Sequence, residues 1–412
     1  MREGWRSSTL GDACDLIKRG ITPKYIEDTG IRILNQKCVR DHAVDYSLAR
    51  RHDSSLKRVP EERIVRLGDV LVNSTGVGTL GRVAQIRNEF EEAVTVDSHV
   101  TIVRPKQSIF YLDFFGYMMI RIESQIAESG EGASGQTELS RSSLAQNFKV
   151  QYPESLSQQQ RIVAILDEAF AGIASAVESA EKNLNNATQI FDNYLNGALT
   201  QTRDGWETTV VGDLCTLKSG TTVSKNLEKP SGDLPYLKVA DMNFPGNEMS
   251  IISSSRFLDM SDISKSAVFP VGTTIFPKRG GAIATNKKRI TETPICTDLN
   301  VMGVIPPSNL LPKLLYYYFQ NVDMRELGSG SSIPQINNYD IEPMSISFPR
   351  SEDEQSKIVE QLDTLGEQTH RLLSIYREKL DALTELKKSI LQKAFSGELT
   401  AEPDKTLAEA GL

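Results

Sequence analysis

Cysteine is scarce in this chain, and its spacing does not suggest a metal site. Only Cys14, Cys38, Cys215 and Cys296 occur in 412 residues, and none belongs to a CxxC or CxxH pair. This pattern disfavours a zinc site and a disulfide framework, and it fits free thiols in a reducing compartment. The chain also has no apolar run long enough to span a bilayer and no basic-then-apolar leader at Met1. We therefore expect a cytoplasmic protein.

Catalytic motifs are missing as well. The sequence contains no GxxxxGK[ST] phosphate loop, no GxGxxG that opens a helix after a strand, and no DPPY-like methyltransferase signature. Its four histidines are scattered, and no pair of carboxylates stands in a context that sequence alone singles out. We therefore assign no catalytic residue and no metal ligand. A self-contained nuclease or methyltransferase with divergent motifs stays open as an alternative.

Excess basic charge is also absent. The formal net charge is −8, while 39% hydrophobic and 24% charged residues are ordinary for a soluble globular protein. A nucleic-acid binder of this composition needs a local basic face.

The strongest positive signal is a pair of stretches with coiled-coil periodicity. Apolar residues recur at alternating spacings of three and four through 157–197, and again through 351–397. A helix of about 40 residues is about 60 Å long, more than a compact domain needs for its own core. We expect the two helices to pack on each other, with two independent amphipathic helices as the alternative. The expected helix–helix seam comprises Val163, Leu166, Phe170, Ile173, Val177, Leu184, Phe191, Ile358, Leu362, Leu365, Leu372, Tyr376, Leu383, Leu386 and Ile390.

Both stretches also have matching start and stop signals. Ser157 with Gln160 predicts a capping box at the start of the first helix, and Ser351 with Glu354 predicts one for the second. Gly197 is expected to stop the first helix and Gly397 the second.

The second half of the chain repeats the first. The segment GWRSSTLGDAC (4–14) matches GWETTVVGDLC (205–215), residues 66–86 parallel 270–290, and residues 130–144 parallel 328–341. Such a repeat decides the architecture before any single motif does. We predict a pseudo-two-fold protein of the α+β class. Two similar mixed α/β domains, at 1–153 and 204–350, are separated by two long antiparallel coiled-coil helices at 154–203 and 351–400, and a tail follows at 401–412.

Local patterns fill in the two domains. Short β-rich runs at 31–35, 82–86 and 99–105 predict strands, and 111–129 has helical spacing. In the second half we expect strands at 234–242 and 273–277 and a helix at 311–327. Cys14 and Cys215 occupy equivalent places beside apolar residues and are expected in the cores.

One stretch of this acidic chain is basic and can provide the local basic face that a nucleic-acid binder needs. From Ile263 to Thr291 the chain has six basic residues and no acid. Cationic loops with Gly, Asn and Thr suit phosphate contacts, and Arg and Asn can also read base edges. The candidate DNA-binding residues are Asn73, Thr75 and Arg82 in the first half and Lys278, Arg279, Lys287, Lys288 and Arg289 in the second. Two readers alike in framework but unlike in these loops would recognise two different short sequences. A solvated loop is the alternative.

Taken together, these segments resemble the specificity (S) subunits of type I restriction-modification enzymes. The resemblance is carried by 4–23 and its echo 205–222, by SLSQQQRIVAILD (155–167) and SEDEQSKIVEQLD (351–363), and by LKKSILQKAFSGELT (386–400). It covers essentially the whole chain, and the set in this order is highly specific.

The resemblance implies a non-catalytic DNA-binding subunit in a restriction system. Two target-recognition domains would each read half of a bipartite sequence in double-stranded DNA. The two helices would act as a spacer and dock two methyltransferase (M) subunits, and restriction (R) subunits would join for cleavage. S-adenosylmethionine, ATP and Mg would be used by those partners and not by this chain. An S subunit of a methylation-only system and a coiled-coil scaffold without a DNA role remain the competing interpretations.

Overall fold

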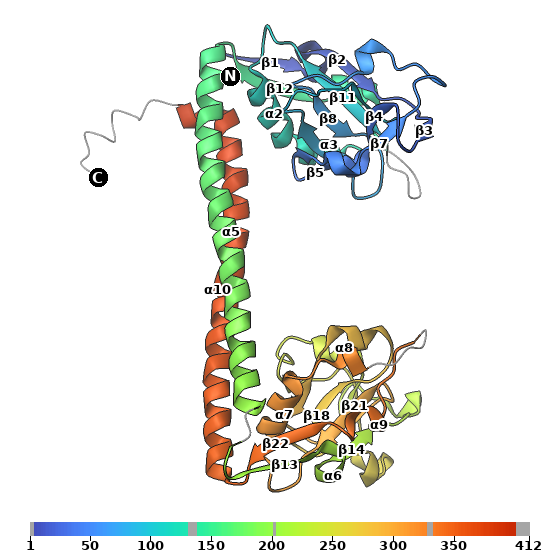
Figure 1. Ribbon diagram of the computed structural model, residues 1–412, viewed down its shortest axis with the longest axis vertical. Helices are drawn as coiled ribbons and strands as arrows, with labels where there is room; N and C mark the ends of the chain where they lie inside the picture. The colour runs from blue at the N-terminus through green and yellow to red at the C-terminus, as the bar shows by residue number, and fades with distance from the viewer. Residues whose placement is uncertain (1–3, 131–137, 201–202, 328–332, 401–412) are drawn as a thin grey trace, which may run out of the picture. The chain divides into compact units, whose positions relative to one another are not determined.

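The computed structural model describes residues 4–130, 138–200, 203–327 and 333–400 (Figure 1). The chain divides into two compact units. Unit 1 comprises Met1–Ala180 and Lys379–Leu412, and unit 2 comprises Glu181–Glu378. The expected tail at 401–412 lies outside the described residues. Among the described residues, no helix combines the length and the apolar character that crossing a bilayer requires.

Unit 1 is built on two four-stranded sheets, labelled in part in Figure 1. The first has the order β2 (Cys14–Arg19), β11 (Val100–Pro105), β8 (Val70–Asn73), β9 (Val83–Gln85) and is antiparallel throughout. The second has the order β10 (Val94–Val96), β4 (Ile31–Leu34), β7 (Arg50–His52), β3 (Tyr25–Ile26). A hairpin of β5 (Val39–Arg40) and β6 (Ala43–Val44) and a pair of β1 (Trp5–Thr9) and β12 (Lys149–Pro153) complete the strands. The helices are α1 (Leu10–Ala13), α2 (Leu112–Arg121), α3 (Glu123–Glu128) and α4 (Arg141–Gln146).

Unit 2 repeats this framework. Its main sheet has the order β14 (Thr216–Ser219), β21 (Val301–Ile305), β18 (Thr274–Pro277), β19 (Arg289–Thr291), β16 (Ser250–Ile251). A second sheet has the order β17 (Phe257–Leu258), β15 (Leu234–Leu237), β20 (Cys296–Thr297), and β13 (Trp206–Val210) pairs with β22 (Ser345–Pro349). The helices are α6 (Val211–Leu214), α7 (Pro312–Gln320), α8 (Met324–Leu327) and α9 (Asn338–Ile341). The expected fold class of two similar mixed α/β repeats with long helices is confirmed.

Two helices of 45 residues each, α5 (Leu156–Thr200) and α10 (Glu352–Ser396), contribute to both units. In unit 1 the start of α5 and the end of α10 share one core with α2, in which Phe114 and Phe395 have ring centroids 5.0 Å apart. In unit 2 the end of α5 and the start of α10 share the core with α7. Within each unit the two helix segments are antiparallel and contribute to the core of the globular part.

The seam residues separate into buried, half-buried and exposed groups. Val163, Leu166, Ile173 and Leu362 are buried. Half-buried are Phe170, Val177, Leu184, Phe191, Ile358, Leu365, Tyr376, Leu383 and Ile390.

Leu372 and Leu386 differ from the prediction, because they are 43% and 47% exposed. The half-buried Leu373 and Leu380 lie on the covered side of α10 instead. A straight helix drifts by about 20° per heptad relative to a seven-residue repeat, so the covered stripe moves away from the expected positions.

The helix ends also correct two predictions. Helix α5 begins at Leu156 with Ser155, not Ser157, as its cap, because Ser155 Oγ accepts a hydrogen bond from Gln158 N at 3.3 Å. Gly197 does not stop α5, which continues to Thr200. A helical glycine costs about 1 kcal/mol, which the burial of neighbouring Leu195 and Leu199 can offset. Gly397 does follow the end of α10 and has the left-handed φ of +82° that favours glycine.

Within the domains most predicted elements exist, but two helices are interrupted and one strand ends early. The helix expected at 311–327 is divided into α7 and α8, with a break at 321–323. The helix expected at 111–129 is interrupted at Ile122, where Glu123 turns to accept a hydrogen bond from Val83 N at 2.9 Å. The strand expected at 234–242 ends at Leu237 and continues as a 3-10 helix at Val239–Asn243. Cys14 and Cys215 are buried, as expected.

Candidate nucleic-acid interface

The same edge of the main sheet is built alike in the two units. Strand β8 leads into a backbone bridge between Thr75 and Glu138 in unit 1, and β18 leads into a bridge between Arg279 and Gln335 in unit 2. Before the neighbouring strand, Asp97 accepts a hydrogen bond from His99 N at 2.9 Å. The equivalent bond in unit 2 joins Asp298 and Asn300 N at 3.0 Å.

Strand register fixes which residues of the two units correspond. Arg19 pairs with Thr101 on β11, while Ser219 pairs with Met302 on β21. Asn73 pairs with Val100, and Pro277 pairs with Val301, which sets β8 and β18 in the same frame. Arg19 therefore corresponds to Ser219, Thr75 to Arg279, His99 to Asn300 and Glu138 to Gln335. We call these two sets of four residues the edge clusters.

The edge cluster of unit 1 presents a carboxylate and an imidazole to solvent. Arg19 donates through Nη1 to Glu138 Oε1 at 2.5 Å and through Nη2 to the carbonyl of Leu139 at 2.7 Å. The Glu138 side chain is 59% exposed. Thr75 Oγ1 and His99 Nδ1 lie 2.7 Å apart, and the His99 side chain is exposed. The cation of this cluster is therefore half-buried and paired, while the carboxylate and the imidazole are more exposed.

The edge cluster of unit 2 presents a cation. Arg279 is exposed and donates through Nε and Nη2 to Gln335 Oε1 at 3.2 and 3.0 Å. Gln335 Nε2 donates to Asn337 Oδ1 at 2.6 Å, and Asn337 Nδ2 donates to the hydroxyl of Tyr339 at 2.8 Å. A chain of polar side chains thus fixes the guanidinium on the surface. Lys278 lies behind it and donates to Ser219 Oγ at 2.7 Å.

The remaining predicted residues of unit 1 are tied to the fold. Asn73 is buried, and its Nδ2 donates to the carbonyl of Gln36 at 3.0 Å. Arg82 is half-buried and donates to the carbonyl of Gly78 at 2.8 Å, which braces the glycine loop after β8. Of the three predicted residues in unit 1, only Thr75 belongs to the edge cluster.

The predicted cations of unit 2 divide in a similar way. Lys288 is only 1% exposed and donates to Asn286 Oδ1 at 2.8 Å and to the carbonyl of Val322 at 2.6 Å. Its burial lowers the pKa to about 8. Arg289 donates to the carbonyls of Asn247, Lys288 and Met242, and burial lowers its pKa as well. Both groups hold the loop after β18 in place rather than facing solvent.

Lys287 is half-buried and donates to Asn243 Oδ1. Arg279 is therefore the one exposed cation among the five predicted in unit 2, all of which lie in the described part of the chain.

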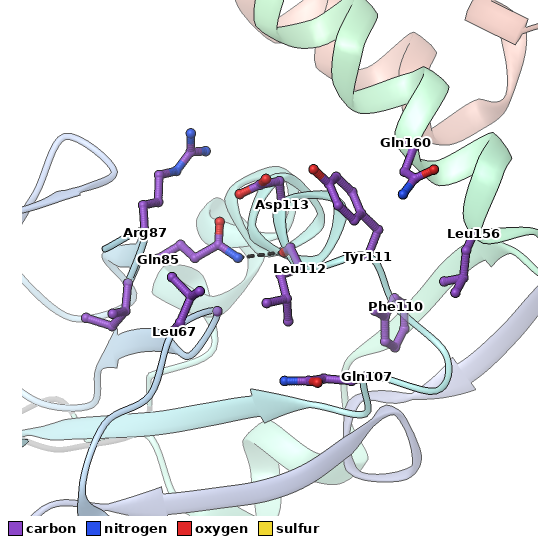
Figure 2. A pocket seen from close by; sticks show the side chains of 12 residues that line it. Leu67, Gln85, Arg87, Gln107, Phe110, Tyr111, Leu112, Asp113, Leu156 and Gln160 are labelled. Carbon is purple, nitrogen blue, oxygen red and sulfur yellow. Dashed lines mark hydrogen bonds between the residues drawn. The ribbon is translucent and has the colours of Figure 1, made fainter. Parts of the chain in front are cut away.

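A pocket of about 400 Å³ lies elsewhere on unit 1, between β9, the start of α2 and the start of α5 (Figure 2). Apolar side chains of Leu67, Phe110, Leu112 and Leu156 line it together with polar and charged groups, and Gln85 Nε2 donates to the carbonyl of Leu112 at 2.5 Å. It contains none of the predicted DNA-binding residues. Among the described residues no group of three or more His, Cys, Asp or Glu side chains could hold a metal ion.

Sequence reasoning missed two residues that lock the long helices onto the domains. Buried Gln159 on α5 accepts from Tyr111 N at 2.8 Å and donates to the carbonyls of Ile109 and Pro153 at 2.8 and 2.9 Å. Gln355 on α10 repeats all three bonds, with Leu311 N and the carbonyls of Asn309 and Pro349, at 2.8 Å each.

A second contact recurs eight residues further along each helix. Tyr117 donates its hydroxyl to Asp167 at 2.5 Å, and Tyr317 donates to Asp363 at 2.7 Å. The signal was present in the sequence, because Gln and Asp stand at the same spacing in the two motifs SLSQQQRIVAILD and SEDEQSKIVEQLD.

Comparison with known proteins gives a consistent family. The family model described as type I restriction modification DNA specificity domain matches residues 2–183 and 203–381. A specificity subunit of the type I restriction enzyme MjaIX from Methanocaldococcus jannaschii is 26% identical over 160 residues, which is 36% of this chain and 35% of that protein. The specificity subunit of the Escherichia coli enzyme EcoDI is 28% identical over 199 residues, 48% of this chain and 39% of that protein. The matched segments thus span little more than a third of these relatives.

Solved structures share the fold. A chain from a study of complex assembly and conformational transition of the type I R-M system matches with a TM-score of 0.77 at 17% identity, over 96% of this chain and 98% of that one. The HsdS subunit of Thermoanaerobacter tengcongensis matches with a TM-score of 0.58 at 17% identity and the same coverage.

Proposed function

This chain belongs to the family of type I restriction-modification DNA specificity domains, and from that premise we propose that it is the sequence-reading subunit of such an enzyme. Its two units each contact one half of a bipartite site in double-stranded DNA. The chain carries out no chemistry itself and binds no cofactor. S-adenosylmethionine, ATP and Mg serve the methyltransferase and restriction subunits that join it.

The observation that carries this proposal is the pair of edge clusters. Four register-matched positions stand on the same framework in both units and hold different polar groups, Arg19, Thr75, His99 and Glu138 against Ser219, Arg279, Asn300 and Gln335. Conserved scaffolding with divergent hydrogen-bonding groups is what two readers of unlike sequences need, because base edges are distinguished by their donor and acceptor patterns.

The long helices supply the surface for the partner subunits. Helix α10 exposes Leu372, Ile375 and Leu386 at 43%, 47% and 47%, and α5 exposes Ile190 at 60%. Clusters of exposed apolar side chains such as Leu372 and Ile375, one turn apart on α10, support a protein-binding role. We assign the docking of methyltransferase subunits to these faces.

The deciding experiment maps methylated adenines in cells that carry this chain together with its methyltransferase partner. The expected result is a bipartite motif with a gap of fixed length, lost when this chain is deleted. Binding of the purified complex to duplex DNA should also weaken steeply as salt rises. Methylation without a fixed motif, or methylation that persists without this chain, would contradict the proposed function.

A further inference from the structure

The guanidinium of Arg279 is held in a geometry that leaves one edge free. Its Nε and Nη2 both donate to the single acceptor Gln335 Oε1. Nη1 has no hydrogen-bond partner among the described residues. Because Gln335 is itself held by Asn337, the Nη1–Nη2 end of the guanidinium points away from its support as a fixed fork. Such a fork matches the O6 and N7 acceptors of guanine in the major groove.

The corresponding bridge of unit 1 carries the opposite chemistry. Thr75 replaces the arginine and Glu138 replaces the glutamine. Arg19 engages Oε1 of Glu138 and leaves Oε2 without a partner in the described part of the chain. Each terminal nitrogen of Arg19 already donates one hydrogen bond, to Glu138 and to the carbonyl of Leu139. The group offered to a ligand here is a carboxylate oxygen, which suits the N4 amino donor of cytosine.

We propose that Arg279 and Glu138 are specificity-determining residues that read one base in each half-site, a guanine through Arg279 and a cytosine through Glu138. Gln335 and Arg19 are the positioning residues that hold them. This inference rests on the proposed function and adds to it the chemical identity of two of the bases read.

The fork distinguishes base reading from phosphate binding. Lysine keeps the charge of Arg279, which is enough for a phosphate contact, but it lacks the planar fork that presents two donors in a fixed geometry to a guanine. Glutamine in place of Glu138 keeps the shape but removes the charge and half of the acceptor capacity. A carboxylate does not bind a phosphate, so Glu138 tests base reading independently of Arg279.

The experiment selects bound duplexes from a random-sequence library with the complex of this chain and its methyltransferase subunits. Wild type, Arg279→Lys, Arg279→Thr, Glu138→Gln and Lys225→Thr are compared. Lys225 is exposed in unit 2 and lies outside both the edge cluster and the basic stretch 263–291, so its variant matches the charge loss of Arg279→Thr. Far-ultraviolet circular dichroism establishes that each variant is folded.

We expect both Arg279 variants to lose about tenfold or more of the preference for guanine at one position of one half-site. Glu138→Gln should relax the preference for cytosine in the other half-site only, and Lys225→Thr should leave the motif unchanged. The inference is overturned if Arg279→Lys behaves as wild type while Arg279→Thr weakens all sequences equally, or if no variant alters the motif. A wild-type complex that enriches no bipartite motif would instead overturn the proposed function, and this inference with it.

Discussion

Replacing Gln159 by leucine should loosen unit 1 and leave unit 2 intact. The side chain makes three hydrogen bonds to backbone groups of the α2 entry and of β12. Leucine fills a similar volume but satisfies none of those groups. At about 1 kcal/mol for each lost bond, the free energy of unfolding of unit 1 should fall by about 3 kcal/mol. In urea, with a slope of about 2–3 kcal/mol per molar, the midpoint should move down by about 1 M.

The chain carries its own reporters for this assay. Trp5 lies in unit 1 and Trp206 in unit 2, both are buried, and the sequence contains no other tryptophan. In a Trp206→Phe background, tryptophan fluorescence follows unit 1 alone, and in a Trp5→Phe background it follows unit 2.

Two matched variants complete the design. Gln160→Leu changes an exposed glutamine on the same helix and should alter stability by no more than about 0.5 kcal/mol. Gln355→Leu removes the equivalent hydrogen bonds in unit 2 and should lower the free energy of unfolding of unit 2 only. If Gln159→Leu unfolds no earlier than Gln160→Leu, or if its effect is as large in the Trp206 signal, the reasoning about the lock is refuted.

Three further outcomes follow from other contacts. Burial holds the pKa of Lys288 at about 8, below its ordinary 10.5. The unfolded chain therefore binds more protons than the folded chain around and above pH 8, so the free energy of unfolding of unit 2 should rise by about 1 kcal/mol between pH 7 and pH 9. Urea titrations should show this rise in wild type, and an equal rise in Lys288→Met would disprove that Lys288 causes it. Arg104 pairs with buried Asp69 at 2.7 Å, so Arg104→Met should destabilise unit 1 by about 3 kcal/mol, and an unchanged Trp5 transition would count against it. Ile375→Asp should weaken methyltransferase binding about tenfold in a titration by analytical ultracentrifugation without altering the stability of unit 2, and undiminished binding would move the docking surface elsewhere.

Internal repetition and apolar periodicity explain which features of the fold could be predicted from the sequence. The duplication is visible because matched segments such as those around Trp5 and Trp206 keep the same residues. The two long helices are visible because their apolar spacing continues for more than four heptads, and the structure contains both as 45-residue helices. Buried Cys14 and Cys215 and the strand at Ile31–Leu34 follow from local pattern for the same reason.

The candidate site could be located only coarsely. The loops after β8 and β18 were identified by their glycines and their lack of acids, and Thr75 and Arg279 do lie in the edge clusters. Charge alone could not reveal that Lys288 is buried, because a lysine that holds a loop and one that faces solvent look the same in a sequence. Glu138 and Gln335 were missed because their partners lie 119 and 56 residues away.

The sequence by itself determined that the chain is a tandem repeat with two long helices, because repetition and periodicity are properties of neighbouring residues. Only the tertiary structure decided which polar groups meet at the sheet edge, which glutamines lock the helices and which leucines of α10 are covered. Those outcomes depend on strand register and helix rotation, and a shift of one residue in either would have turned a different side chain inward.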